Sequence, residues 1–189
     1  MSHGMTTLSE NDPDASSHVQ FMKLAIDQAN LSIPVQSGYC VGAVLVQLDP
    51  HRTNPEDRFR ILATGYSREL LGNTHAEECC LLKLAQLPQS GQHDHPQGAE
   101  YEDMSTPHPS KELVMYSTME PCSTRLSGNR PCSDRLIESG VRTVYVGVRE
   151  PDHFVQKVVG VENMVEQGMR VVHIPGYEAE CLAPNRHVL

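Results

Sequence analysis

The chain has 189 residues, which is enough for a single domain with a substantial buried core. Its 24 acidic and 15 basic side chains give a formal net charge of −9, and Lys and Arg never form a run of five or more. A nucleic-acid backbone is normally gripped by a basic face, so this composition disfavours nucleic acid as a partner and favours a small-molecule substrate.

The sequence also argues against membrane insertion and export. No apolar run approaches the roughly 18 residues that a membrane-spanning helix requires, and no secretory signal opens the chain. The six cysteines lack the spacing of a small disulfide-bonded scaffold. We therefore expect no membrane partner, reduced thiols and a cytoplasmic location, with the nucleus as the alternative.

The first predicted element is a helix that follows a polar tail. Residues 1–15 are rich in Ser, Asp and Asn, and we expect them to form a disordered N-terminal tail. Ser16 or Ser17 is a suitable N-cap for the helix, whose apolar residues recur at helical spacing as far as Asn30.

Two apolar runs of strand length follow, at residues 40–47 and 60–67. A polar connection that contains proline joins them, and the pair is predicted to form an antiparallel hairpin. Gly42, inside the first run, has two interpretations. Either a helix packs closely on the sheet at this point, or a flat ring approaches the backbone there.

The remaining sequence alternates helices with strands. A helix is predicted over residues 75–87, and a polar insertion loop follows it at 88–110. Further strands are predicted at 113–118, 142–148 and 169–174, with helices at 133–139 and 158–167 between them. Helices between consecutive strands imply parallel crossovers. We therefore expect an α/β protein with three α/β/α layers, in which helices cover both faces of a mixed five-stranded sheet. This domain would occupy residues 16–175, and residues 176–189 would form a C-terminal tail.

Three short segments carry a set of metal-ligating side chains. They supply His75, Cys122 and Cys132, and Glu77 stands two residues after the histidine. One imidazole and two thiolates suit Zn²⁺, and a structural zinc site would normally have a fourth protein ligand. Three ligands leave one position for water, and the Glu77 carboxylate can carry a proton of that water. The set therefore predicts a zinc hydrolase.

The predicted elements place these side chains at comparable positions. His75 and Cys132 each open a predicted helix, and Cys122 follows a predicted strand. In α/β sheets, ligands collect at the carboxyl ends of strands and at adjoining helix N-termini. Cys79 and Cys80 lie deeper in an apolar helix, and we expect them to be core thiols.

This pattern resembles the zinc-dependent cytidine/deoxycytidylate deaminase superfamily, whose signature is H-x-E followed by P-C and a second Cys. The resemblance covers roughly residues 20–175 and implies the cytidine deaminase-like fold. It implies one Zn²⁺ per chain, with His75, Cys122 and Cys132 as its ligands. Glu77 would be the proton shuttle rather than a ligand, and the reaction would be the hydrolytic removal of an amino group.

The loop between the two cysteines departs from most of the superfamily. It has nine residues, where most members have two, and in this it resembles the deaminases of riboflavin biosynthesis. Thr118-Met-Glu-Pro-Cys122 and Gly147-Val-Arg-Glu-Pro-Asp152 also resemble segments of that family. The chain is most similar to its stand-alone fungal members. This implies conversion of 2,5-diamino-6-ribitylamino-4(3H)-pyrimidinone 5′-phosphate to 5-amino-6-ribitylamino-2,4-pyrimidinedione 5′-phosphate, with release of ammonia.

Such a substrate needs partners for its phosphate and its ribityl chain. Arg125 and Arg130 in the long loop are candidates for the phosphate, the alternative being that they are solvated loop charges. The aligned segment implies that Glu150 and Asp152 bind ribityl hydroxyls.

The pyrimidine ring needs a pocket, and the resemblance suggests which residues form it. The backbone near Ala76 and Thr118 would orient the ring, and Tyr39 would close the pocket. The resemblance also implies a homodimer.

Three other functions remain open. A deoxycytidylate or cytidine deaminase shares the zinc site, but its loop between the cysteines is short. A tRNA adenosine deaminase would show a basic face and a short Pro-Cys-x-x-Cys. A non-catalytic interaction module with structural zinc is the third alternative, and Glu77 argues against it because a structural site has no use for a spare carboxylate.

Overall fold

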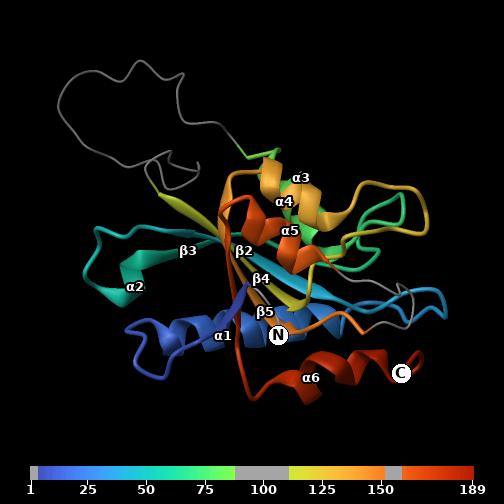
Figure 1. The fold of residues 1–189 in the computed structure, drawn as a ribbon, viewed down its shortest axis with the longest axis horizontal. Coiled ribbons are helices and arrows are strands. Elements are labelled where there is room, and N and C mark those ends of the chain that lie inside the picture. Colours follow the sequence, from blue (N-terminus) through green and yellow to red (C-terminus); the bar gives the residue numbers. More distant parts are fainter. Residues whose placement is uncertain (1–3, 88–110, 152–158) are drawn as a thin grey trace.

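Six strands form one mixed sheet at the centre of the protein (Figure 1), as a computed structural model shows for residues 4–87, 111–151 and 159–189. The predicted insertion loop at 88–110 lies outside these described residues. The strands run β1-β6-β5-β4-β2-β3 across the sheet. Their bounds are β1 Met5–Thr7, β2 Gly42–Leu48, β3 Phe59–Tyr66, β4 Glu112–Met119, β5 Val141–Val148 and β6 Arg170–His173.

Helices cover both faces of the sheet. Their bounds are α1 Ala15–Ala29, α2 Pro55–Arg58, α3 Ala76–Leu84, α4 Cys132–Glu138, α5 Gly160–Glu166 and α6 Glu178–Leu182, with a short 3₁₀ helix, η1, at Ala183–Asn185. Figure 1 shows α1 and α6 on one side of the sheet and α3, α4 and α5 on the other. The predicted α/β/α layering is thereby confirmed. No helix in the described ranges combines the length and the hydropathy that a membrane span requires.

The strand directions bring the carboxyl ends of all strands in the sheet except β2 to one edge. β2 is antiparallel to both β3 and β4, whereas β4, β5 and β6 are mutually parallel. The predicted hairpin and the predicted parallel crossovers are therefore both confirmed. β3, β4 and β5 all end at the same edge, where a ligand site is expected in an α/β sheet.

Two predictions about the ends of the chain were wrong. The sheet has six strands rather than five, because residues 5–7 form β1, which pairs in parallel with β6, instead of belonging to a disordered tail. Three residues are too few to show the alternation of apolar and polar side chains that marks a strand. The pairing of β1 therefore depends on the free backbone edge of β6.

The C-terminal segment is packed rather than a tail. Residues 176–189 form α6 and η1, and Cys181 and Asn185 are fully buried there. The Asn185 amide accepts from the backbone N–H of Cys40 at 2.6 Å and donates to the Cys40 carbonyl at 3.1 Å. This pair of bonds attaches the end of the chain to the start of β2, a contact between residues 145 positions apart.

Close helix packing explains the glycine in β2. A Cβ atom added to Gly42 would lie 2.0 Å from the carbonyl oxygen of Ala25 and 2.3 Å from the amide nitrogen of Ala29. The backbone of α1 therefore rests directly on β2 at this position. Of the two interpretations of Gly42, helix packing is right and the approach of a flat ring is wrong.

Candidate metal and active site

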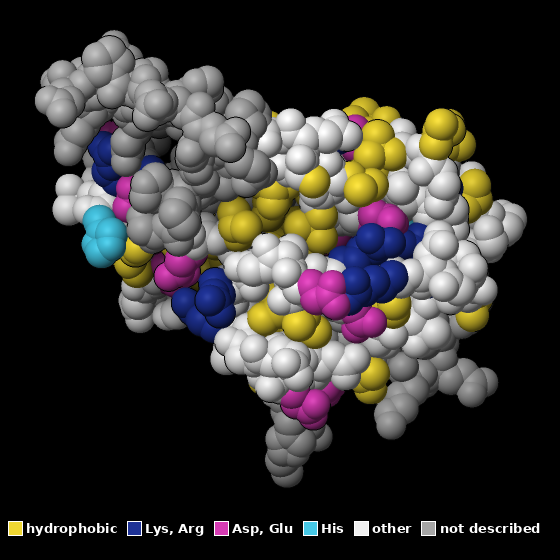
Figure 2. Space-filling model, turned by 90° about the horizontal axis from the view of Figure 1, so that it is seen from above, with side chains coloured by type: hydrophobic (Ala, Val, Ile, Leu, Met, Phe, Trp, Pro, Cys, Tyr) yellow, Lys and Arg dark blue, Asp and Glu magenta, His cyan; other side chains and the backbone are white. Residues whose placement is uncertain are grey.

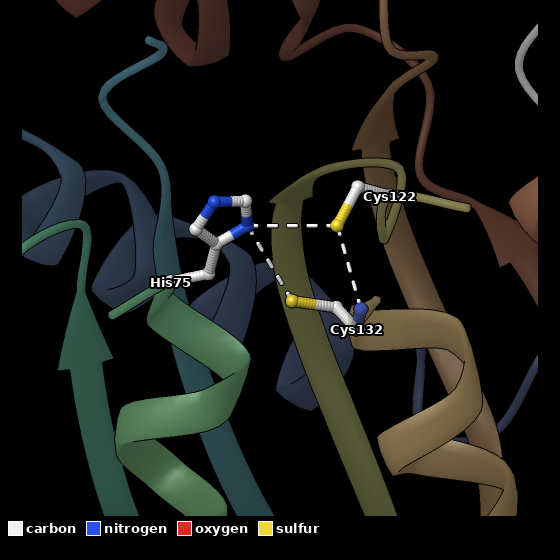
Figure 3. Close-up of side chains that lie close together, drawn as sticks. All are labelled: His75, Cys122 and Cys132. Carbon is white, nitrogen blue, oxygen red and sulfur yellow. Dashed lines mark hydrogen bonds between the residues drawn. The ribbon is translucent and has the colours of Figure 1, made fainter. Parts of the chain in front are cut away.

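Three potential metal ligands meet at the edge of the sheet where β3 and β4 end (Figure 3). His75 is the N-cap residue of α3, Cys132 is the first residue of α4, and Cys122 follows β4. The Nδ1 atom of His75 lies 3.5 Å from the Sγ atom of Cys122 and 3.5 Å from the Sγ atom of Cys132. The two helix starts and the strand end therefore aim their donors at one point.

These distances suit a zinc ion. Zn–S bonds of about 2.3 Å and Zn–N bonds of about 2.0 Å, at a tetrahedral angle, place sulfur and nitrogen about 3.5 Å apart. His75, Cys122 and Cys132 form one of the two groups in the described residues whose donor atoms are close enough to hold a metal ion. Three protein ligands leave the fourth tetrahedral position for a non-protein ligand, as in catalytic zinc sites.

The other group of potential ligands is engaged in hydrogen bonds and an ion pair. It consists of Asp12, Asp14 and His18. Both ring nitrogens of His18 contact tyrosine hydroxyls, with Tyr116 at 2.7 Å and Tyr145 at 2.9 Å. Arg58 lies 2.9 Å from the Asp14 carboxylate. The His75 group differs from this one in its donor types, because one imidazole and two thiols suit zinc.

The contact between the two cysteines shifts the pKa values of their thiols in opposite directions. Contact with Cys132 and His75 lowers the pKa of the Cys122 thiol to about 4, and the same contact with Cys122, together with burial, raises the pKa of Cys132. The backbone N–H of Cys132 also donates to the Cys122 sulfur at 3.4 Å. A divalent cation would hold both sulfurs as thiolates, because metal binding displaces the thiol protons.

Glu77 lies beside this group, in the first turn of α3. Its side chain is buried, and the Ser117 hydroxyl donates to its Oε1 atom at 3.1 Å. Burial raises the pKa of the Glu77 carboxyl, and the negative charge of Cys122 acts in the same direction. A carboxyl that is held by a hydrogen bond and whose pKa is raised suits proton transfer.

A cavity opens onto the donor group, and three of the predicted substrate residues line it. Tyr39, Arg125 and Glu150 line it together with His75 and Glu77. The Tyr39 hydroxyl donates to the carbonyl of Pro151 at 3.2 Å, which closes one side of the cavity.

Glu150 places a buried carboxyl in this wall of the cavity. Burial and the negative charge of Cys122 raise the pKa of Glu150 to about 8. Its Oε2 atom is buried and has no hydrogen-bond partner in the described part of the chain. A hydroxyl group of a ligand would satisfy this atom.

Three other residues predicted to contact the substrate do not line the cavity. Ala76 and Thr118 are fully buried and do not line the cavity, and the Thr118 hydroxyl accepts from the backbone N–H of Gly42. Arg130 is on the outer surface, where it pairs with Glu138, and it does not line the cavity either. Asp152 lies outside the described residues.

The sequence interpretation missed Arg68, which lines the cavity at the end of β3. Its guanidinium donates to the carbonyls of Tyr39 at 3.2 Å and Ile33 at 2.8 Å. Arg68 also has a φ of 66°, a left-handed conformation that is uncommon for residues other than glycine. Sequence alone offers no signal for it beyond its place at the end of a predicted strand.

Comparisons with known proteins agree with this geometry. The family model of the cytidine and deoxycytidylate deaminase zinc-binding region matches residues 15–148. A diaminohydroxyphosphoribosylamino-pyrimidine deaminase from Schizosaccharomyces pombe is 37% identical over 166 residues, which cover 87% of this chain. This chain spans only 34% of the length of that relative.

Solved structures of the Rib2 deaminase from Aspergillus oryzae share the fold. A C-terminal deletion mutant at pH 4.6 is 34% identical with a TM-score of 0.71, over 88% of this chain and 89% of that one. The same protein in complex with DARIPP is 32% identical with a TM-score of 0.70, over 88% of both chains. This chain therefore belongs to the cytidine and deoxycytidylate deaminase family and contains its zinc-binding region.

Proposed function

We propose that this protein is a zinc-dependent aminohydrolase of riboflavin biosynthesis. It would hydrolyse the cyclic amidine of a ribitylamino-pyrimidinone 5′-phosphate. Water would add at the carbon that bears the 2-amino group, ammonia would leave, and an oxo group would take the place of the amino group. The observation that carries the proposal is the meeting of His75, Cys122 and Cys132 beside the buried Glu77 carboxyl, in one cavity. The similarity to the two fungal deaminases supports this substrate class.

His75, Cys122 and Cys132 would hold one Zn²⁺ per chain. A zinc ion in such a site lowers the pKa of a bound water toward about 7. Glu77 would take the proton of the attacking water and return protons to the ring nitrogen and the departing amine. The Ser117 hydroxyl donates to Oε1 of Glu77 and would orient the carboxyl for these transfers.

The walls of the cavity would bind the rest of the substrate. Glu150 is suited to a ribityl hydroxyl because one of its carboxyl oxygens is buried without a partner in the described residues. Tyr39, which lines the cavity, would close over the ring. The backbone near Ala76 and Thr118 stays a prediction for orienting the ring, although both residues are fully buried and neither lines the cavity. Asp152 remains a prediction for the ribityl chain.

The location and the assembly of the protein are also proposals. All six cysteines are free and buried, which supports a reducing compartment such as the cytoplasm. The small-molecule phosphorylated pyrimidine is the expected partner, and the homodimer implied by the family resemblance stays a prediction.

The proposal is tested by measuring ammonia release from the purified, zinc-loaded protein. The substrates are the ribitylamino-pyrimidinone phosphate, deoxycytidylate, cytidine and an adenosine-containing anticodon stem. We expect turnover of the first alone, and Glu77→Gln protein is the control for contaminating deaminases. Turnover of a nucleotide instead would replace the substrate, and no turnover of any of the four by zinc-loaded protein would favour a non-catalytic module.

A further inference from the structure

We propose that Glu78 is a positioning residue that holds the three ligand-bearing segments together and thereby sets how tightly the metal is bound. This inference rests on the zinc site of the proposed function. The segments are the start of α3 with His75, the stretch after β4 with Cys122 and the loop at 123–131 that follows it, and the start of α4 with Cys132. A loop of nine residues between two ligands has many conformations in the unfolded chain. Restricting them on folding has an entropic cost, which contacts between the loop and other segments must offset.

The Glu78 carboxylate contacts all three segments. Its Oε2 atom lies 2.7 Å from Nη1 of Arg125 in the loop, and its Oε1 atom lies 2.8 Å from Nη2 of Arg135 on α4. The backbone N–H of His75 donates to Oε2 at 3.4 Å, which completes a capping box at the start of α3. One carboxylate therefore connects the His75 end of α3 with the loop that follows Cys122 and with the helix that begins at Cys132.

Arg125 also contacts the backbone just before His75 and just before Cys132. Its side chain is buried, and its Nη2 atom donates to the carbonyl of Asn73, two residues before His75. Its Nη1 atom also lies 3.5 Å from the carbonyl oxygen of Arg130, two residues before Cys132. The terminal nitrogens of Arg125 are thus engaged by protein groups, and this supports a positioning role in place of the phosphate contact that the sequence suggested.

Arg135 attaches α4 to the same point. It lies three residues after Cys132, and its Nε atom donates to the Arg130 carbonyl at 3.4 Å. Two arginines from different elements therefore share one carboxylate and one carbonyl. Figure 2, which looks onto the face formed by α3, α4 and α5, shows basic and acidic side chains in contact near the middle of that face.

Burial makes this arrangement sensitive to the loss of one charge. The side chain of Arg125 is 1% exposed and that of Glu78 is 11% exposed. Removing one partner of such a pair leaves the other charge buried without compensation. Loss of Glu78 would therefore free the Arg125 side chain and, with it, the loop at 123–131. The Sγ atoms of Cys122 and Cys132 would then be held less firmly in place.

The test compares Glu78→Gln with wild type by competition for zinc against a chelator of known affinity. Glutamine keeps the shape of the side chain and removes its charge. We expect the zinc dissociation constant to rise by about 10–100-fold, which is the usual effect of changing a group that orients metal ligands. The melting temperature of the metal-free protein is measured in parallel, because a merely structural pair would lower this temperature without weakening zinc binding.

Lys83→Gln is the matched control. Lys83 forms an ion pair with Glu69 at 2.5 Å and donates to the carbonyl of Thr64, so it ties the same helix α3 to β3 and the residues just after it, rather than to the loop at 123–131 or to α4. We expect a smaller drop in the melting temperature of the metal-free protein than in Glu78→Gln, because this pair is more exposed, and a zinc dissociation constant within about twofold of wild type.

The outcomes separate this inference from the proposed function. Zinc binding by Glu78→Gln within twofold of wild type would overturn the positioning role. Absence of zinc binding in the wild type would instead overturn the zinc site itself. If Glu78→Gln does not fold, Arg135→Gln serves in its place, because it removes only the partly exposed ion pair between Arg135 and Glu78. An unchanged zinc affinity in that variant would equally overturn the inference.

Discussion

The hydroxyl of Ser117 donates a hydrogen bond to the Glu77 carboxylate across 3.1 Å, from the central strand β4 to the first turn of α3. Both side chains are buried, and 40 residues separate them in the sequence. The bond fixes a carboxyl group that lies two residues from the His75 ligand candidate. His75 and Glu77 both line the same cavity.

Glu77→Gln is expected to keep its zinc and to lose turnover. The amide oxygen still accepts from Ser117, so the local structure is preserved, but an amide cannot carry a proton at neutral pH. General acid–base catalysis contributes a factor of about 100 to 10,000, so kcat should fall by at least about 100-fold. Zinc content and ammonia release are measured on the same sample, and retained activity would show that Glu77 is not the shuttle.

Cys132→Ala is expected to lose the metal. It removes one of three proposed ligands and leaves too few protein donors for tight zinc binding. Cys80→Ala is the control, because Cys80 is a fully buried thiol in α3 whose sulfur contacts the carbonyl of Ala43, apart from the donor group. Metal analysis after dialysis should find zinc only in the control. A fully loaded Cys132→Ala protein would remove this residue from the ligand set.

Gly42→Ala is expected to destabilise the fold. The new Cβ atom would lie 2.0 Å from the carbonyl oxygen of Ala25, so α1 must move away from the sheet. Overpacking of this kind costs about 1–3 kcal/mol, and backbone contacts yield less than side chains do. Denaturant unfolding measures the loss. Gly38→Ala is the control, because the nearest atom to its Cβ would lie at an ordinary 3.5 Å, and equal stabilities for the two variants would contradict the close packing.

His18 is expected to contribute less to stability as the pH falls. Burial lowers the pKa of His18 from 6.5, and this outweighs the opposing charges of Asp12 and Asp14. The unfolded chain therefore takes up the histidine proton first, so the contribution is present above pH 6.5 and is lost as the pH drops below that value.

His18→Gln gives the measurement for this prediction. The difference in the free energy of unfolding between wild type and His18→Gln should be larger at about pH 7.5 than at about pH 5.5, because the remaining groups titrate alike in both proteins. A difference that grows toward low pH would mean that the folded protein favours the charged ring.

Much of the fold could be predicted because its elements carry their own periodicity. The helix expected from Ser16 or Ser17 begins at Ala15, and the strand expected at 142–148 spans Val141–Val148. The three proposed zinc ligands and Glu77 could be selected because zinc chemistry restricts the residue types. The short spacing of His75 and Glu77 is also visible directly in the sequence. Pairing at the two ends of the chain could not be predicted, since β1 has three residues and no periodic pattern.

The residues around the donor group were harder to assign than the donors themselves. Arg125 and Arg130 look alike in the sequence, five positions apart in one polar loop. In the fold, Arg125 is buried against Glu78, 47 residues away, whereas Arg130 stays on the surface beside Glu138. Residue type dictates that a buried guanidinium needs a carboxylate, but which one approaches depends on how α3 and α4 pack. The sequence therefore specifies the chemistry of the site, and the packing of distant elements specifies which charges support it.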